Sequence, residues 1–304
     1  MRVAVGQDVT QKVDHFSGVC VSPAKNLVFV LVGLVPVGLG LYLTLGGATP
    51  SCQPPPLPWT SPQLIAEMGA PDIPASPEWV GFSTSGAYPG TLATYERAVA
   101  RGFSAVEMDV QVGRDGTLVV LSSNNLTQIG ESSGRVSELD QVQLEALLVA
   151  RDTPVALVSH IFAALGDQVS YVIQVPAGEL GLRAIQELAQ LAGERKVVVM
   201  GQDSEVLKKA RQQEGWPTLW RGSPESDLEK TLQTAEEQCA SGVVVPAAWV
   251  QQGTMEATNK VVVVSGVDNP ESWSQLQSLG VGAAFTRFTR LIPGGDLDEG
   301  SNTP

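Results

Sequence analysis

The chain of 304 residues contains only three cysteines and two histidines. Three cysteines are too few for a disulfide-framework fold or for a zinc module built on paired Cys-x-x-Cys motifs. Clusters of lysine and arginine are also missing, and the formal net charge is −13, so no nucleic-acid partner is expected. The hydrophobic content of 43% is that of a globular protein, which argues against disorder of the whole chain.

Charge is absent from residues 27–45, which are mostly apolar. A run of this length can cross the hydrocarbon core of a bilayer. Its three glycines and one proline would weaken a soluble helix but are tolerated in membrane helices. We therefore expect a transmembrane signal anchor over residues 27–46, after an N-terminal segment of residues 1–26. A buried core helix and a cleaved signal peptide are the alternatives.

Basic residues precede this apolar run, and no charged residue follows it until Glu67. The positive-inside rule then predicts a single-pass type II membrane protein with a cytosolic N-terminus and a lumenal or extracellular C-terminal part. Asn125 begins the glycosylation sequon Asn-Leu-Thr, which fits that location. Cys52 and Cys239 would share an oxidising compartment and could pair, although a free, buried Cys239 is an equal alternative.

Composition divides the remainder of the chain into three parts. Residues 47–77 are rich in proline and predict an extended stalk. Residues 78–292 alternate short valine-rich runs with amphipathic, helix-like stretches, and residues 293–304 form an acidic, glycine-rich tail. The first run is at residues 78–83, and later ones include 104–110, 169–175, 196–200, 218–220, 242–246, 260–266 and 282–286.

Nearly continuous apolar runs are typical of parallel strands that are buried on both faces. About eight strand–helix units over residues 78–292 predict an α/β fold, a (β/α)8 TIM barrel. An open, doubly wound sheet is the alternative. That fold would favour a glycine-rich loop after an early strand, and neither Gly-x-Gly-x-x-Gly nor Gly-x-x-x-x-Gly-Lys-[Ser/Thr] occurs.

Glu107 and Asp109 are two positions apart in the run at residues 104–110, so their side chains share one face of the expected strand. Functional side chains of barrels gather where strands end. A carboxylate pair there can hold a hard divalent cation such as calcium or magnesium. Two charges at the solvated end of a strand are the alternative interpretation.

Residues 88–148 contain Glu-x-Asp-Val at 107–110 and Asp-Gly at 115–116. This stretch resembles the glycerophosphodiester phosphodiesterase family, whose signature runs His-Arg-Gly after the first strand, Pro-Glu-Asn-Thr, Glu-x-Asp-Val, an Asp-Gly turn and a strand that ends in His-Asp. The resemblance extends over about residues 78–293. It implies a TIM barrel of the phospholipase-C-like phosphodiesterase type, a divalent ion, and two histidines that act on a phosphodiester.

The chain departs from this signature at the positions that carry the chemistry. The first family histidine is expected to align near Phe82 and the second at Ser122. A carboxylate that would complete the metal site with Glu107 and Asp109 aligns with Gln174. The closing aspartate aligns with Arg287, which is a candidate phosphate contact.

Neither histidine of the chain is placed to replace the missing pair. His15 lies in the N-terminal segment, and His160 lies in an apolar, helix-like stretch. A serine hydroxyl has no pKa near 7 and cannot shuttle protons as imidazole does. We therefore expect a catalytically inactive, membrane-anchored relative that binds a phosphorylated lipid head group or a protein. The alternative is an active phosphoric diester hydrolase that acts on glycerophosphodiesters or lysophospholipids through a metal-bound water.

Overall fold

The computed structural model describes residues 52–60, 62–72, 88–129, 133–149, 153–250 and 258–292. All of them belong to the second of two compact units, which covers residues 50–304. No helix within these described ranges is long and apolar enough to cross a membrane. The expected N-terminal segment, membrane anchor and acidic tail lie outside the described residues and stay predictions.

Eight parallel strands form a closed barrel, which confirms the expected α/β fold. Closure is shown by β1, which pairs in parallel with both β2 and β11. An open sheet is therefore wrong. In order around the barrel the strands are β1 (Gln63–Glu67), β11 (Ala283–Thr286), β10 (Val261–Ser265), β9 (Gly242–Pro246), β8 (Thr218–Arg221), β7 (Lys196–Gly201), β6 (Ser170–Gln174) and β2 (Ala105–Val112).

The first strand lies earlier in the chain than the sequence analysis expected. β1 lies inside the segment assigned to a stalk, and residues 78–83 lie outside the described residues. The boundary between stalk and barrel at residue 78 is therefore corrected. β1 has only five residues, which is a usual length for a strand. So short an apolar run is hard to recognise among the prolines around it.

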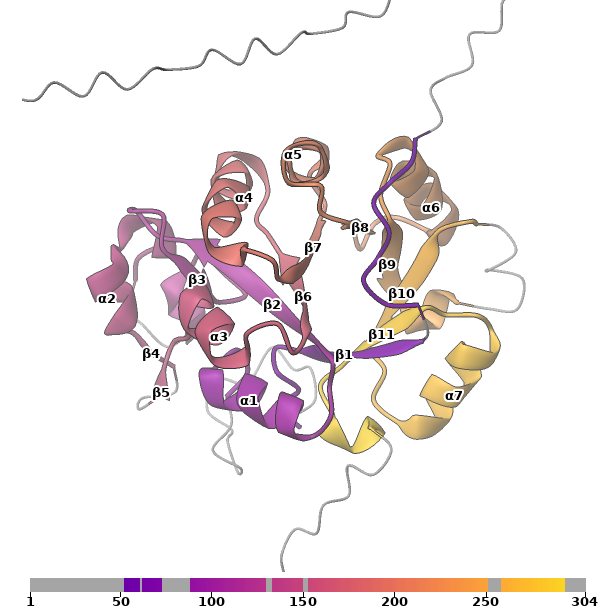
Figure 1. The fold of residues 1–304 in the computed structure, drawn as a ribbon, viewed down its shortest axis with the longest axis horizontal. Helices are drawn as coiled ribbons and strands as arrows, with labels where there is room; N and C mark the ends of the chain where they lie inside the picture. The colour runs from indigo at the N-terminus through magenta and orange to yellow at the C-terminus, as the bar shows by residue number, and fades with distance from the viewer. Residues whose placement is uncertain are drawn as a thin grey trace, which may run out of the picture. The chain divides into compact units, whose positions relative to one another are not determined.

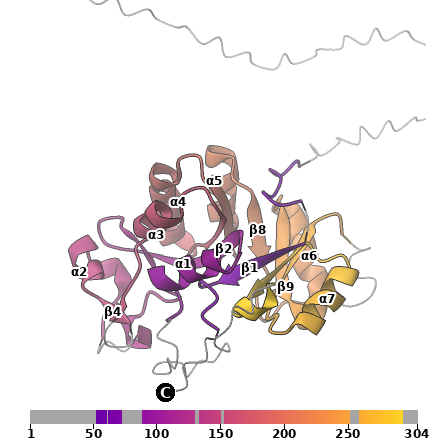
Figure 2. The same ribbon diagram turned by 60° about the horizontal axis from the view of Figure 1, so that its bottom comes forward.

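Helices follow most of the strands and surround the barrel (Figure 1, Figure 2). They are α1 (Leu92–Ala100), α3 (Val158–Leu165), α4 (Gly178–Ala192), α5 (Ser204–Glu214), α6 (Leu228–Glu237) and α7 (Pro270–Ser278). Side-chain caps mark where three of them begin, because Asp203, Asp227 and Asn269 each accept backbone N–H groups of α5, α6 and α7.

A side excursion separates β2 from α3. It begins with β3 (Leu118–Val120), which pairs antiparallel to β2 and is not a barrel strand. Short elements with their own small apolar core complete it: the 3-10 helices Leu126–Ile129 and Val136–Glu138, α2 (Gln141–Glu145), β4 (Leu148–Val149) and β5 (Thr153–Pro154). Two further 3-10 turns, Ala247–Trp249 and Thr289–Leu291, follow β9 and β11.

Alternation along each strand divides the apolar residues into two cores. On β2, Val106 and Met108 belong to the outer core beneath the helices, whereas Ala105 belongs to the core inside the barrel. Ile65, Val172 and eight further residues make up this inner core. The same alternation therefore decides which residue points into the barrel where each strand ends.

The amino-terminal ends of the strands are covered by residues 52–60, named the base segment here. Leu57 and Trp59 pack against the inner core. Cys52 forms a disulfide with Cys239, the pairing that the sequence left open, and the Ser241 hydroxyl donates to the carbonyl of Pro55 at 2.6 Å. In Figure 1 this indigo stretch runs beside α6 and β9.

Candidate functional site

Charged and amide side chains occupy the opposite, carboxyl end of the barrel. All but Asp109, which follows Glu107, lie two positions after an inner apolar residue, as Glu67 follows Ile65 and Arg287 follows Phe285. This polar set, named the barrel mouth here, comprises Glu67 of β1, Glu107 and Asp109 of β2, Gln174 of β6, Arg221 of β8 and Arg287 after β11.

Glu107 is the most deeply placed of these groups, with 3% of its surface exposed. Its Oε2 accepts the Met68 N–H at 3.1 Å, and its backbone carbonyl accepts the Tyr95 hydroxyl at 3.0 Å. Burial raises the pKa of the Glu107 carboxyl well above its usual range, and the charges of Asp109 and Glu67 raise it further. The side chain is therefore biased toward its neutral form.

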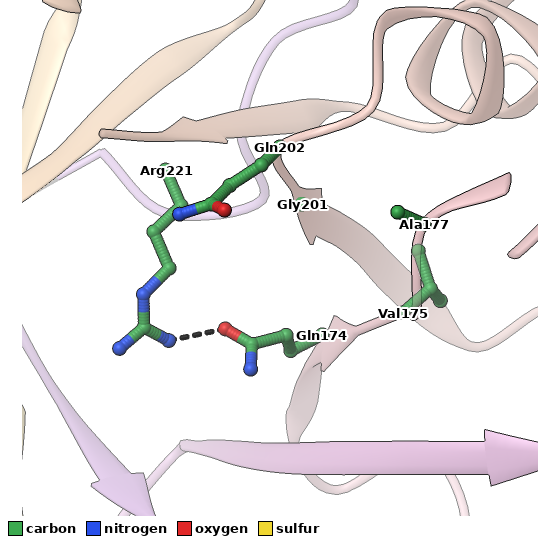
Figure 3. Close-up of a pocket in the computed structure, with 6 residues that line it drawn as sticks. All are labelled: Gln174, Val175, Ala177, Gly201, Gln202 and Arg221. Carbon is green, nitrogen blue, oxygen red and sulfur yellow. Dashed lines mark hydrogen bonds between the residues drawn. The ribbon is translucent and has the colours of Figure 1, made fainter. Parts of the chain in front are cut away.

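Asp109, Gln174 and Arg221 form a chain of hydrogen bonds from β2 through β6 to β8. The Gln174 Nε2 donates to Asp109 Oδ1 at 2.5 Å, and Arg221 Nη1 donates to Gln174 Oε1 (Figure 3). A flipped amide would set oxygen against carboxylate and nitrogen against guanidinium, so its neighbours determine the amide's orientation. Burial raises the pKa of Asp109 to about 6, although Arg221 opposes that shift.

Glu67 and Arg287 form the second charged contact of the mouth. Arg287 donates through Nε at 3.0 Å and Nη2 at 2.9 Å, both to Glu67 Oε1. The two side chains are 25% and 14% exposed, so the ion pair is largely withdrawn from water. Such a charge-assisted contact holds both groups in place more strongly than a surface pair does.

A small cavity of about 180 Å³ opens beside Arg221. It is lined by Gln174, Val175, Ala177, Gly201, Gln202 and Arg221, and Figure 3 shows the Gln174 amide facing the guanidinium. This volume is below the usual range for pockets of drug-sized ligands. The cavity is suited to a small polar group.

The predicted site residues fall into two sets. Glu107, Asp109 and Gln174 are brought together, and Arg287 reaches the same mouth. Ser122 is exposed after β3, while Phe82 lies outside the described residues.

Three other residues that the sequence singles out lie at the surface. The sequon residue Asn125 is exposed and its Oδ1 accepts the Thr127 N–H at 3.1 Å, so the sequon is accessible. His160 lies on α3, as the helix-like stretch predicted, and its side chain is exposed. Asp115 accepts the Thr117 N–H at 3.1 Å, as expected for a tight turn.

The oxygen atoms of the barrel mouth are the candidate ligands for a divalent cation. Calcium and magnesium need several converging oxygen ligands. Gln174 presents its nitrogen to Asp109 and commits its oxygen to Arg221, while Glu67 is held by Arg287. Among the described residues, no group of three His, Cys, Asp or Glu side chains is placed to hold a metal ion. As arranged, these residues do not fit the cation that the sequence analysis expected.

Two residues of the mouth were missed by sequence reasoning. Glu67 was assigned to the stalk, and Arg221 follows directly after the run at residues 218–220. The available signal was the spacing of two from an inner apolar residue, Ile65 for Glu67 and Leu219 for Arg221.

A family model matches residues 83–291 and is described as the glycerophosphoryl diester phosphodiesterase family. The chain belongs to this family. Comparison of its sequence with curated proteins gave no match.

Solved structures of family enzymes share the fold. A phosphodiesterase from Oleispira antarctica, solved with the product sn-glycerol-3-phosphate, is 15% identical with a TM-score of 0.63, covering 77% of this chain and 96% of its own. The glycerophosphodiester phosphodiesterase from Thermotoga maritima is 15% identical with a TM-score of 0.60, and the match covers 77% of this chain and 97% of its own. The one from Agrobacterium tumefaciens is 14% identical with a TM-score of 0.60, and the match covers 76% of this chain and 99% of its own. At these identities the likeness shows the fold alone.

The position of β1 bears on the expected place of the first family histidine. The family's His-Arg-Gly follows its first strand, and here β1 ends in Glu67, followed by Met68 and Gly69. Gly69 has φ +80°, and a Cβ there would lie 2.6 Å from Thr94 Oγ1, so this position requires glycine. Gly90, which lies just before α1, donates its N–H to the Met68 carbonyl at 2.9 Å. β1 thus places Glu67 at the end of a barrel strand, where the family signature has its first histidine, while the residues near Phe82 lie outside the described residues.

Proposed function

We propose that this family member is catalytically inactive by the family's histidine route and acts as a membrane-anchored binding or interaction module. The proposal rests on the two strand ends at which the family signature has a histidine, because β1 ends in Glu67 and the residue expected to align after β3 is Ser122. Glu67 is bound to Arg287, and Ser122 cannot exchange protons near neutral pH. The barrel mouth would then recognise a phosphorylated lipid head group or a protein partner without cleaving it.

The second candidate is an active phosphoric diester hydrolase. Glu67 is the observation that favours it, because a carboxylate at the histidine position can act as a base. Glycerophosphodiesters or lysophospholipids would be the substrates, with a water activated by a divalent ion at Glu107, Asp109 and Gln174. That ion would require Gln174 to turn its oxygen away from Arg221.

Turnover measurements on the full chain separate the two candidates. Glycerophosphocholine and lysophosphatidylcholine would be offered with calcium or magnesium, and the matched control is Glu107→Ala/Asp109→Ala. We expect the same background rate from both proteins. A rate that exceeds the control and disappears with EDTA would establish the hydrolase instead.

The anchor and its orientation have a separate test. The accessible Asn125 sequon and the Cys52–Cys239 disulfide both suit an oxidising, lumenal or extracellular compartment. In membranes of glycosylating cells, we expect an endoglycosidase to increase the mobility of the full chain but not of Asn125→Gln. Extraction of the chain by carbonate would contradict the anchor, and an unmodified Asn125 would contradict the orientation.

A further inference from the structure

Three carboxylates and two guanidinium groups meet at the barrel mouth. Glu67 and Glu107 are register partners in β1 and β2, and Asp109 follows on the same face of β2. Arg221 and Arg287 reach them from β8 and from the end of β11. Ionised carboxylates that point into the barrel and are shielded from water repel one another strongly unless a cation compensates their charge.

The two guanidinium groups bind this cluster through different routes. Arg287 contacts Glu67 directly through two N–H groups. Arg221 acts through Gln174, whose oxygen accepts from the guanidinium and whose nitrogen donates to Asp109. Gln174 thereby bridges the Arg221 guanidinium and the Asp109 carboxylate. Its amide is neutral, whereas an acidic side chain at this position would add a negative charge that requires another cation.

We infer that Arg221 and Arg287 replace a divalent cation at this barrel mouth, so that the protein holds its carboxylate cluster without metal. The inference deepens the proposed function, because both concern the same mouth, but each can fail alone. Arginine keeps its charge at every physiological pH. Unlike a bound ion, it is part of the chain and cannot leave the site, so the carboxylates are compensated whatever the calcium concentration.

The wild-type full chain supplies the first test, with the metal ions themselves as probes. We expect calorimetric titration with calcium and with magnesium to give no saturable binding, and EDTA to leave Tm unchanged. Saturable binding that Asp109→Asn abolishes would overturn the inference. Turnover is not measured here, so a metal-binding but inactive protein would refute this inference and leave the proposed function standing.

Removal of the two arginines supplies the second test. In Arg221→Met/Arg287→Met, the uncompensated carboxylates should lower Tm by roughly 6–12 °C. Calcium should restore much of that loss and show saturable binding, which wild type is expected to lack. The matched control is Arg114→Met, which removes an exposed arginine that pairs with Asp140 at 2.8 Å, and it should do neither.

A double variant that fails to fold would still be informative. Refolding in calcium and in EDTA would be compared, and recovery in calcium alone supports replacement of the ion. Arg287→Met by itself provides the milder form of the test, and Arg221→Lys/Arg287→Lys should keep Tm insensitive to calcium. Equal stability of Arg287→Met with and without calcium, with no binding of the ion, would overturn the inference.

Discussion

At the amino-terminal ends of the strands, the barrel is covered by Leu57 and Trp59 and tied by the Cys52–Cys239 disulfide, whereas at the carboxyl ends it is held by charges and amides. The base thus depends on burial and on a covalent restraint of the chain, and neither requires a partner of opposite charge. The mouth depends on pairing, as between Arg287 and Glu67. Loss of one group there leaves another uncompensated.

This difference separates two kinds of stabilisation within one fold. An apolar base can tolerate changes of pH and salt, because its contacts carry no charge. A charged mouth is sensitive to both, because salt screens charges and pH changes them. Variants at the two ends should accordingly differ in kind as well as in size.

The largest effect is expected at the base, from Cys52→Ser/Cys239→Ser. The disulfide spans a sequence separation of 187 residues, and in the chain-entropy model a loop of that length contributes about 5 kcal/mol. Thermal denaturation should show a loss of roughly 10–20 °C. Cys20→Ser is the control and should leave Tm unchanged. A double variant as stable as wild type would remove the covalent restraint from the comparison.

A double-mutant cycle on Glu67→Gln and Arg287→Met should give the next largest effect. Arg287→Met leaves a partly buried carboxylate without its guanidinium and should lower the free energy of unfolding by about 3 kcal/mol. With Glu67→Gln added, part of that loss should be recovered, with a coupling of about 1–3 kcal/mol by urea denaturation. Strictly additive single effects would show that the pair does not stabilise the mouth.

Trp59 tests whether burial alone closes the base. Its half-buried ring packs on the inner core, so Trp59→Ala should lower the free energy of unfolding by about 2 kcal/mol. Within the described part of the chain, the buried Nε1 has no hydrogen-bond partner. The free energy of unfolding of Trp59→Phe should therefore stay within about 1 kcal/mol of wild type, because phenylalanine keeps an aromatic ring there and removes the unsatisfied donor. A larger loss in Trp59→Phe than in Trp59→Ala would contradict this account.

The smallest effect is expected from Asp203, which begins α5 and also receives the Gly178 N–H of α4 at 2.8 Å. These hydrogen bonds, the one from Gly178 foremost, lower the pKa of the Asp203 carboxyl. Asp203→Ala should cost about 1–2 kcal/mol at neutral pH.

The pH dependence of Asp203 follows from that direction. A lowered folded-state pKa means that the contribution is complete above the unfolded-state value of about 4 and is lost as pH falls through the folded-state pKa. Chemical denaturation of wild type against Asp203→Ala should therefore show a difference that narrows below pH 4. A constant difference down to the acid limit would assign the effect to packing.

Most of the fold could be predicted from the sequence, because strand runs such as 242–246 and 260–266 are apolar and flanked by helix-like stretches. β1 was not predicted, because five residues among prolines give too short a periodic hydrophobic pattern. Without β1, the first strand was expected at residues 78–83 and the first histidine near Phe82, and Glu67 was assigned to the stalk. For the same reason, the pairing of Arg287 could not be anticipated.

The sequence alone determined which side chains point into the barrel, because alternation along a strand is a local property of the backbone. It therefore placed Glu107 and Asp109 on one face. Only the tertiary structure decided which charges meet. Glu67 and Arg287 lie 220 positions apart in the chain, and they come into contact because β1 pairs with β11 to close the barrel. Long-range pairing of this kind is set by the whole sheet, and no local pattern encodes it.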